Sequence, residues 1–144
     1  MATRATIAKL DKNGVKAIYL HSDGYLEHAG KILDQHYQDE SKVDELLSHG
    51  DVSSLNENIG EKLPFNDYML FHEKKQCRFY HRDRGEDKKE AAKLGGENEL
   101  VKFATEKCDA EYIYIFAFGS WYVYDVYNNS EFVELEEVLY VPIR

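Results

Sequence analysis

The sequence predicts a single α+β domain in which an antiparallel sheet of β-hairpins carries helices packed on one face. Residues 4–20 alternate about Asn13-Gly14, a dipeptide typical of tight hairpin turns. Residues 112–127 form two aromatic, β-branched runs about Gly119-Ser120, which predicts a second hairpin. Helical periodicity is confined to the chain between these hairpins, and a length of 144 residues indicates one domain over residues 1–144.

The rest of the chain is organised around residues 17–37. A strand over residues 17–20 ends near His21, and Asp23-Gly24 has the composition of a turn. Apolar residues then recur at spacings of three and four, which predicts a helix over residues 25–37. Asp23 is expected to cap this helix, because a carboxylate at that position can accept the free backbone N–H groups.

The other elements follow from shorter patterns. Asp39 or Ser41 is predicted to open the second helix, and Asn98 to cap the third. Residues 56–75 and 84–97 could be flexible. The predicted segments are, in order, a helix over 40–49, a loop over 51–70, a strand over 76–81, a weak helix or disorder over 86–94, a helix over 99–107, and an extended segment over 132–141 with a helical turn at 134–139 as its alternative.

Composition limits the classes of partner. The net charge of −9, from 27 acidic and 18 basic residues, disfavours general DNA or RNA binding, which depends on neutralising phosphates. The N-terminus lacks the apolar run of a signal peptide, and no stretch approaches the roughly 20 apolar residues of a membrane span. The two cysteines do not make a disulfide framework. We therefore expect a cytoplasmic protein with no membrane association.

The same short motif, His-x-Asp, occurs twice, as His21-x-Asp23 and His81-x-Asp83, each at the end of an expected strand. Residues two apart share a face of a strand, so four ligands or acid–base groups would converge if the two strand ends were neighbours. Zinc or iron would suit such a set. Because the motif is short and its Asp can simply orient or cap, we predict neither a metal nor another cofactor.

Arginines recur close to the second motif. Arg78, Arg82 and Arg84 alternate, so in an extended conformation all three would face one side, together with Tyr80 if the register twists. Guanidinium groups match phosphate geometry, and Arg4 could join them. The alternative is that these arginines pair with surface carboxylates. The tyrosines of residues 112–127 are interpreted as core on one face rather than as a platform for stacking bases.

Several segments resemble a family of small phage and prophage proteins, and the resemblance covers most of the chain. It implies a phage accessory role, and such proteins commonly block host enzymes or capture defence signals. It transfers no activity and no catalytic residues. The chain departs from the family at Ser22 and Leu26, where an aromatic residue and a proline are expected. The matching segments are Ala2-Thr3-Arg4-Ala5-Thr6-Ile7, Ile18-Tyr19-x-His21-x-Asp23-Gly24-Tyr25, Gly50-Asp51-x-Ser53-Ser54-Leu55 and Tyr80-His81-Arg82-Asp83-Arg84-Gly85-Glu86.

The leading hypothesis is a phage counter-defence protein that is not an enzyme and sequesters a nucleotide-like signalling molecule, with homo-oligomerisation as one way to close its pocket. One alternative is a direct inhibitor that engages a host protein through the acidic residues 131–137. Another is a small nucleotide or phosphodiester enzyme with His21 and His81 as acid and base. The predicted ligand-binding residues are Arg4, His21, Asp23, Tyr25, Arg78, Tyr80, His81, Arg82 and Arg84.

Overall fold

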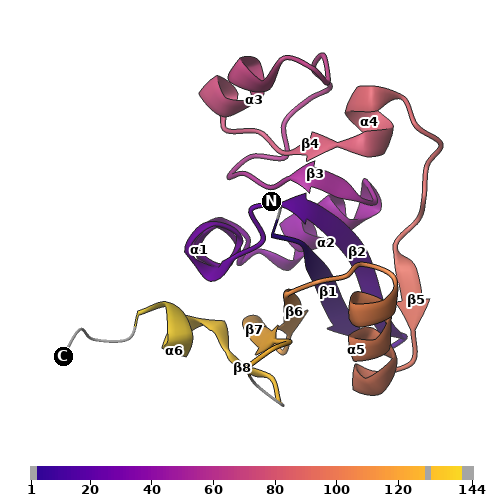
Figure 1. Ribbon diagram of the computed structural model, residues 1–144, viewed down its shortest axis with the longest axis vertical. Coiled ribbons are helices and arrows are strands. Elements are labelled where there is room, and N and C mark those ends of the chain that lie inside the picture. The colour runs from indigo at the N-terminus through magenta and orange to yellow at the C-terminus, as the bar shows by residue number, and fades with distance from the viewer. Residues whose placement is uncertain (1–2, 129–130, 141–144) are drawn as a thin grey trace.

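The computed structural model describes residues 3–128 and 131–140 of the chain. Its strands form one eight-stranded sheet in the order β4-β3-β2-β1-β6-β7-β8, with β5 paired to β2 (Figure 1). The elements are β1 (Ala5–Asp11), β2 (Gly14–Ser22), the π-helical turn η1 (Leu26–Gly30), α1 (Lys31–His36), α2 (Glu40–Ser48), β3 (Val52–Ser54), α3 (Tyr68–Lys74), β4 (Arg78–Phe79), α4 (Tyr80–Arg84), β5 (Ala92–Leu94), α5 (Glu97–Glu106), β6 (Tyr112–Ala117), β7 (Ser120–Asp125), β8 (Val133–Glu134) and α6 (Leu135–Leu139).

The predicted α+β class is confirmed. Strands β1 and β2 form the first hairpin, with Asp11 opposite Gly14, and β6 and β7 form the second, with Ala117 opposite Ser120. Most strand pairs are antiparallel, but β1 pairs with β6 and β2 pairs with β3 in parallel. The sheet is therefore mixed, and the parallel pair of β1 with β6 joins the two hairpins side by side.

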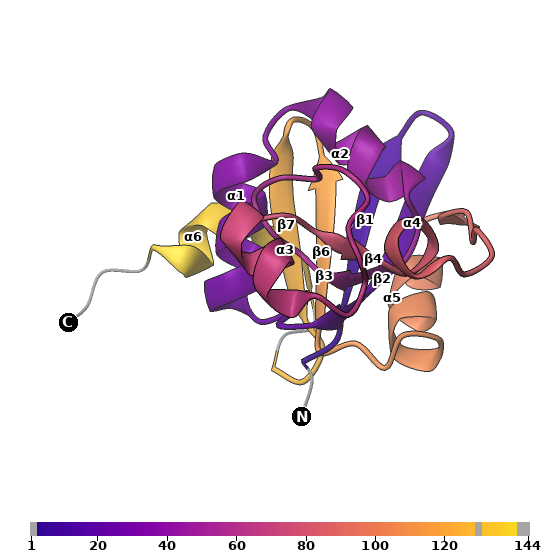
Figure 2. The ribbon, with the colours of Figure 1, turned by 90° about the horizontal axis from the view of Figure 1, so that it is seen from above.

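Helices cover both faces of the sheet. One core cluster joins Ile7 and Leu20 to η1, α1, α2 and α6, and the other joins Ala8 and Ala17 to Leu100 of α5. Because neighbouring residues of a strand point to opposite faces, these clusters lie on opposite sides of the sheet. Figures 1 and 2 show α1 and α6 on one side and α5 on the other. The expectation that all helices pack on one face is wrong for α5, which covers the face opposite to α1, α2 and α6.

The tyrosine-rich hairpin contributes to the first core. Tyr114 is fully buried and its hydroxyl donates to the carbonyl of Gly24 at 2.6 Å. Trp121 is also buried, and its indole Nε1 donates to the carbonyl of Tyr37 at 2.9 Å. These bonds join the second hairpin to the corner after β2 and to the end of α1. They agree with the interpretation of this face as core.

Two of the predicted helix caps are wrong. Asp23 has φ of 55° and lies ahead of the helix, whose N-cap residue is Tyr25, with no side-chain cap. Helix α5 begins at Glu97 rather than after Asn98, so Gly96 occupies its N-cap position. The Asp39 cap of α2 is confirmed, because its side chain accepts from the backbone N–H of Ser41.

The segment between α2 and α5 has more regular structure than its composition indicates. The predicted loop 51–70 contains β3 and the start of α3. The predicted strand over 76–81 is reduced to Arg78–Phe79, because α4 begins at Tyr80, and the end of 86–94 forms β5 instead of a helix. Beyond β7, the strand β8 agrees with the extended segment predicted from residue 132, and α6 agrees with the helical alternative for residues 134–139, while residue 141 lies outside the described residues. The flexibility of 56–75 and 84–97 remains a prediction.

Helix length bears on the expected absence of membrane association. Within residues 3–128 and 131–140, none of the helices is long and apolar enough to cross a bilayer.

Candidate functional site

Arginines and aromatic rings from four separate segments of the chain contact one another in a continuous series. The series crosses β2, α4, β4 and the start of α3, at the end of the sheet where α3 and α4 lie (Figure 1). It contains five of the predicted site residues. We call it the arginine–aromatic strip, and its members in order of contact are Arg4, Tyr19, His21, Tyr80, Arg84, Phe65, Arg78 and Tyr68.

A hydrogen-bonded chain forms the first part of the strip. Strand β2 places Tyr19 and His21 two residues apart, and hence on one face. The Nε of Arg4 donates to the Tyr19 hydroxyl at 3.0 Å, and this oxygen lies 2.6 Å from Nδ1 of His21. The tautomer of the imidazole sets which of the two groups donates in this second hydrogen bond.

The charge state of His21 follows from its surroundings. Burial lowers the pKa of His21, and the charges of Arg4 and Arg78 lower it further. Burial also raises the pKa of Tyr19, against the opposing effect of Arg4. At neutral pH this part of the strip therefore presents a neutral imidazole and a neutral phenol beside the Arg4 guanidinium.

Helix α4 presents the next two members. Tyr80 and Arg84 are four residues apart, which places them on one face of the helix. The Arg84 guanidinium lies 5.2 Å from the centre of the Tyr80 ring and 5.1 Å from that of Phe65. Arg84 also pairs with Glu86 at 2.5 Å, yet its side chain is 52% exposed. Arg84 is therefore a cation that a ligand can reach.

Arg78 forms the buried end of the strip. Its guanidinium lies 4.3 Å from the Phe65 ring centre and 4.0 Å from that of Tyr68. One terminal nitrogen donates to the Ser53 hydroxyl at 2.8 Å and the other to the carbonyl of Phe65 at 3.2 Å. The buried Nε has no hydrogen-bond partner among the described residues. The Arg78 guanidinium thus contacts the Phe65 and Tyr68 rings from the protein side, and the Tyr68 ring is exposed to solvent.

Arg82 has a structural role. Residues 80–84 are helical, so Arg82 points away from Tyr80 and Arg84, and the prediction that Arg78, Arg82 and Arg84 share one face is wrong. The Arg82 guanidinium donates to the carbonyls of Ile59 at 2.8 Å and Cys77 at 3.0 Å, and it pairs with buried Asp83 at 3.0 Å. These bonds hold the segment before α3 against β4 and α4.

The two His-x-Asp motifs do not form one site. His81 is exposed and its Nδ1 lies 2.6 Å from the carbonyl of Glu86, whereas Asp83 is buried beneath α4. Asp23 and Tyr25 are exposed, and no contact joins either to the strip within the described part of the chain. The same residues contain no group of three or more His, Cys, Asp or Glu side chains that could hold a metal ion. The predicted convergence fails because residues 80–84 form α4, and a helix directs the side chains of His81 and Asp83 to different sides.

Three members of the strip were missed by the sequence interpretation. Tyr19 could have been found, because it precedes His21 by two residues in an expected strand and must share its face. Phe65 and Tyr68 lie in residues 51–70, whose composition predicts a loop. Their proximity to Arg78 depends on the fold of residues 56–77, which no local pattern specifies.

Comparison of the chain with protein-family models, curated proteins and solved structures found no match. The resemblance to phage accessory proteins therefore remains a prediction.

Proposed function

We propose that this protein acts by binding, and that the arginine–aromatic strip captures a nucleotide-like, phosphate-bearing small molecule. The observation that carries the proposal is the continuous series of contacts between arginines and rings, assembled from segments near residues 4, 20, 66 and 80. Aromatic rings stack on bases, and guanidinium groups bind phosphate. A strip that offers both along its length suits a ligand that has both.

Individual roles follow from exposure and charge. Arg84 and Arg4 are the cations available to phosphate, with side chains 52% and 40% exposed. Tyr68 and Tyr80 provide rings for stacking, and the imidazole of His21 provides a neutral hydrogen-bonding group for a base or sugar. Each arginine already has a carboxylate partner, so a phosphate must displace Asp109 or Glu86 as it binds. Both pairs are exposed, which makes this displacement inexpensive.

Sequestration sets a requirement on the ligand. Removing a signalling molecule from solution needs a Kd of about 1 nM, or about −12 kcal/mol. An open strip cannot supply this through one base, because stacking contributes roughly 1–3 kcal/mol per base. We therefore propose a ligand with more than one nucleotide unit, or an oligomer that closes two strips around it. In a phage this binding would act as counter-defence in the host cytoplasm.

The test is a thermal-shift screen with linear nucleotides, cyclic nucleotides and ADP-ribose derivatives. A ligand at a hundred times its Kd adds about 2.7 kcal/mol of stability. We expect a shift for the wild-type protein that is lost in Arg84→Ala and retained in Lys102→Ala, an exposed cation on α5. Ligand recovered unchanged after incubation would agree with capture, whereas turnover that is lost in His21→Ala and His81→Ala would establish the enzyme alternative. A flat screen would refute the proposal.

The protein-inhibitor alternative has an observation of its own. The carboxylates of Glu131, Glu134, Glu136 and Glu137 are all exposed on β8, on α6 or just before them. An acidic surface of this kind suits a basic protein partner and would give a complex that weakens with salt. The two candidates are separable, because reversing the charge of Glu136 and Glu137 would abolish that complex and leave nucleotide binding intact.

A further inference from the structure

Three lysines stand directly opposite one another on three adjacent strands. In the antiparallel register Lys9 of β1 faces Lys16 of β2, and Lys16 faces Lys93 of β5. Residues paired in this way have neighbouring Cβ atoms on one face of the sheet, and like charges there destabilise it. The chain therefore places three positive charges in a row at the face that also carries α2.

The first lysine of the row has its charge compensated by carboxylates of α2. Lys9 is buried and pairs with Asp44 at 2.7 Å and with Glu40 at 2.8 Å, both from α2. Burial alone would lower the pKa of Lys9, but the hydrogen bonds and charges of Asp44 and Glu40 outweigh it and raise the pKa. Lys9 thus remains charged and fixed in position.

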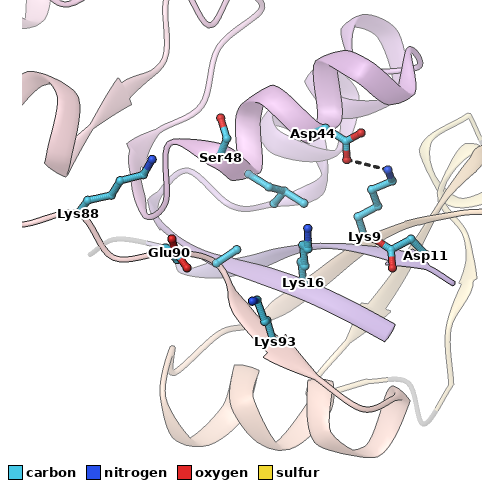
Figure 3. Close-up of a pocket in the computed structure, with 10 residues that line it drawn as sticks. Lys9, Asp11, Lys16, Asp44, Ser48, Lys88, Glu90 and Lys93 are labelled. Atoms are coloured by element: carbon cyan, nitrogen blue, oxygen red, sulfur yellow. Dashed lines mark hydrogen bonds and ion pairs between the residues drawn. The ribbon is translucent and has the colours of Figure 1, made fainter. Parts of the chain in front are cut away.

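The other lysines of this face have no such partner. Lys16, Lys93 and the nearby Lys88 make no ion pair with a carboxylate within the described residues. They line a cleft of about 460 Å³ between α2, the end of the β1–β2 hairpin and the segment that leads into β5. Figure 3 shows Lys16 extending from its strand towards α2, with Lys88 on the other side of the space. We call it the lysine cleft, lined by Lys9, Asp11, Lys16, Asp44, Leu47, Ser48, Lys88, Glu90, Ala91 and Lys93.

We propose that the lysine cleft is a second binding site, separate from the strip, for a compact polyanion of the pyrophosphate class. Lysine binds phosphate as a flexible point charge, and several convergent amines suit adjacent phosphate groups. The volume lies in the range of small-ligand sites. Asp11 and Glu90 also line the cleft, and with the net charge of −9 they disfavour long polyanions such as nucleic acids.

The row of lysines gives this proposal an unusual signature. In the free protein, Lys16→Gln and Lys93→Gln relieve like-charge repulsion, so each variant unfolds at a higher temperature than the wild type. The same variants lose an ionic contact to the anion, which weakens binding about tenfold each. A lysine that only supports the fold would give the opposite sign in the first measurement.

The experiment is isothermal titration calorimetry at constant ionic strength, with thermal unfolding of each free protein. Pyrophosphate and tripolyphosphate test the free anion, ATP tests the same group carried on a nucleotide, and orthophosphate and sulfate are the reference anions. We expect pyrophosphate, tripolyphosphate or ATP to bind more tightly than the reference anions. Binding should weaken in Lys16→Gln and Lys93→Gln and stay unchanged in Lys102→Gln. Pyrophosphate and tripolyphosphate binding should also persist in Arg84→Ala, which separates the cleft from the strip.

Three results would overturn the proposal. The first is no binding of any oligophosphate to the wild-type protein. The second is equal binding by the wild type and the Lys16→Gln, Lys93→Gln double variant. The third is a lower unfolding temperature for that free double variant than for the wild type. The first two would assign the lysine row to the ordinary solvated surface, and the third would assign it to support of the fold.

Discussion

Replacing Asp83 by Ala removes the group that joins α4 to the segment before α3. The Asp83 side chain is 0% exposed and pairs with Arg82 at 3.0 Å. Its two oxygens also accept from the backbone N–H groups of Phe79 at 2.8 Å and Leu63 at 3.1 Å. The Arg82 side chain is only 12% exposed, so the substitution leaves a largely buried cation without its counter-charge.

The magnitude follows from these contacts. Breaking a buried ion pair by removing one partner costs about 3–5 kcal/mol, because the remaining charge stays desolvated. The two orphaned amides would each add about 1–3 kcal/mol, but water entering the space left by Ala can hydrate them. Arg82 also keeps its bonds to the carbonyls of Ile59 and Cys77. We therefore expect the free energy of unfolding to fall by about 4 kcal/mol.

Urea denaturation at pH 7 measures this loss. The matched control is Glu86→Gln, which breaks the exposed pair with Arg84 and should cost less than about 1 kcal/mol. The transition of Asp83→Ala should move to a lower urea concentration with little change in its slope. A loss no larger than that of Glu86→Gln would refute the structural role assigned to Asp83 and Arg82.

Three further predictions concern the fold. Gly24→Ala should lower stability by about 1–3 kcal/mol in thermal unfolding, because its new Cβ would lie 2.7 Å from the Cβ of Ala5, and an unchanged midpoint would contradict this close approach. Phe118→Asn should raise stability by about 0.5–1 kcal/mol, since Phe118 is 88% exposed with φ of 54° at a turn position that Asn prefers, and a loss would show that its ring contributes to the fold. Burial and neighbouring arginine charges lower the pKa of both His21 and His49, so the unfolded chain takes up protons before the folded protein as the pH falls. The free energy of unfolding should therefore be retained above about pH 6.5 and decrease below it. A His21→Gln, His49→Gln variant should lose less of this free energy between pH 7.5 and 5.5 than the wild type.

The sequence predicts those parts of the fold that depend on interactions between residues close together in the chain. The turn at Lys12-Asn13, followed by Gly14 with φ of 117°, sets the register of the first hairpin, and the Asp39 cap with the apolar periodicity after it sets α2. The prediction that all helices pack on one face is wrong for α5, because α5 and α2 have similar amphipathic sequences that do not show which face of the sheet each one covers. Which face each of them covers is decided by the order of strands in the sheet, which depends on contacts distant in sequence.

The candidate site, like the fold, can be predicted only in part from local sequence patterns. The sequence identified Arg4, His21, Tyr80 and Arg84 as chemically interesting, and the fold brings them into one strip. It assumed an extended chain after Phe79, because an aromatic and charged run has no helical period over so few residues. The lysine row depends on the pairing of β5 with β2, and β5 lies in a charged segment whose pattern indicates a helix or disorder. Only the Lys9–Lys16 pair could have been derived from the hairpin register.

The most direct test of the account is two-dimensional NMR of the isotopically labelled protein, titrated with the nucleotide that gives the largest thermal shift. The account predicts that backbone and side-chain resonances of Arg4, His21, Tyr80 and Arg84 move together as the ligand is added, while those of α5 and α6 stay in place. Shifts that avoid these residues, or that cluster only at the acidic surface of α6, would contradict capture by the arginine–aromatic strip.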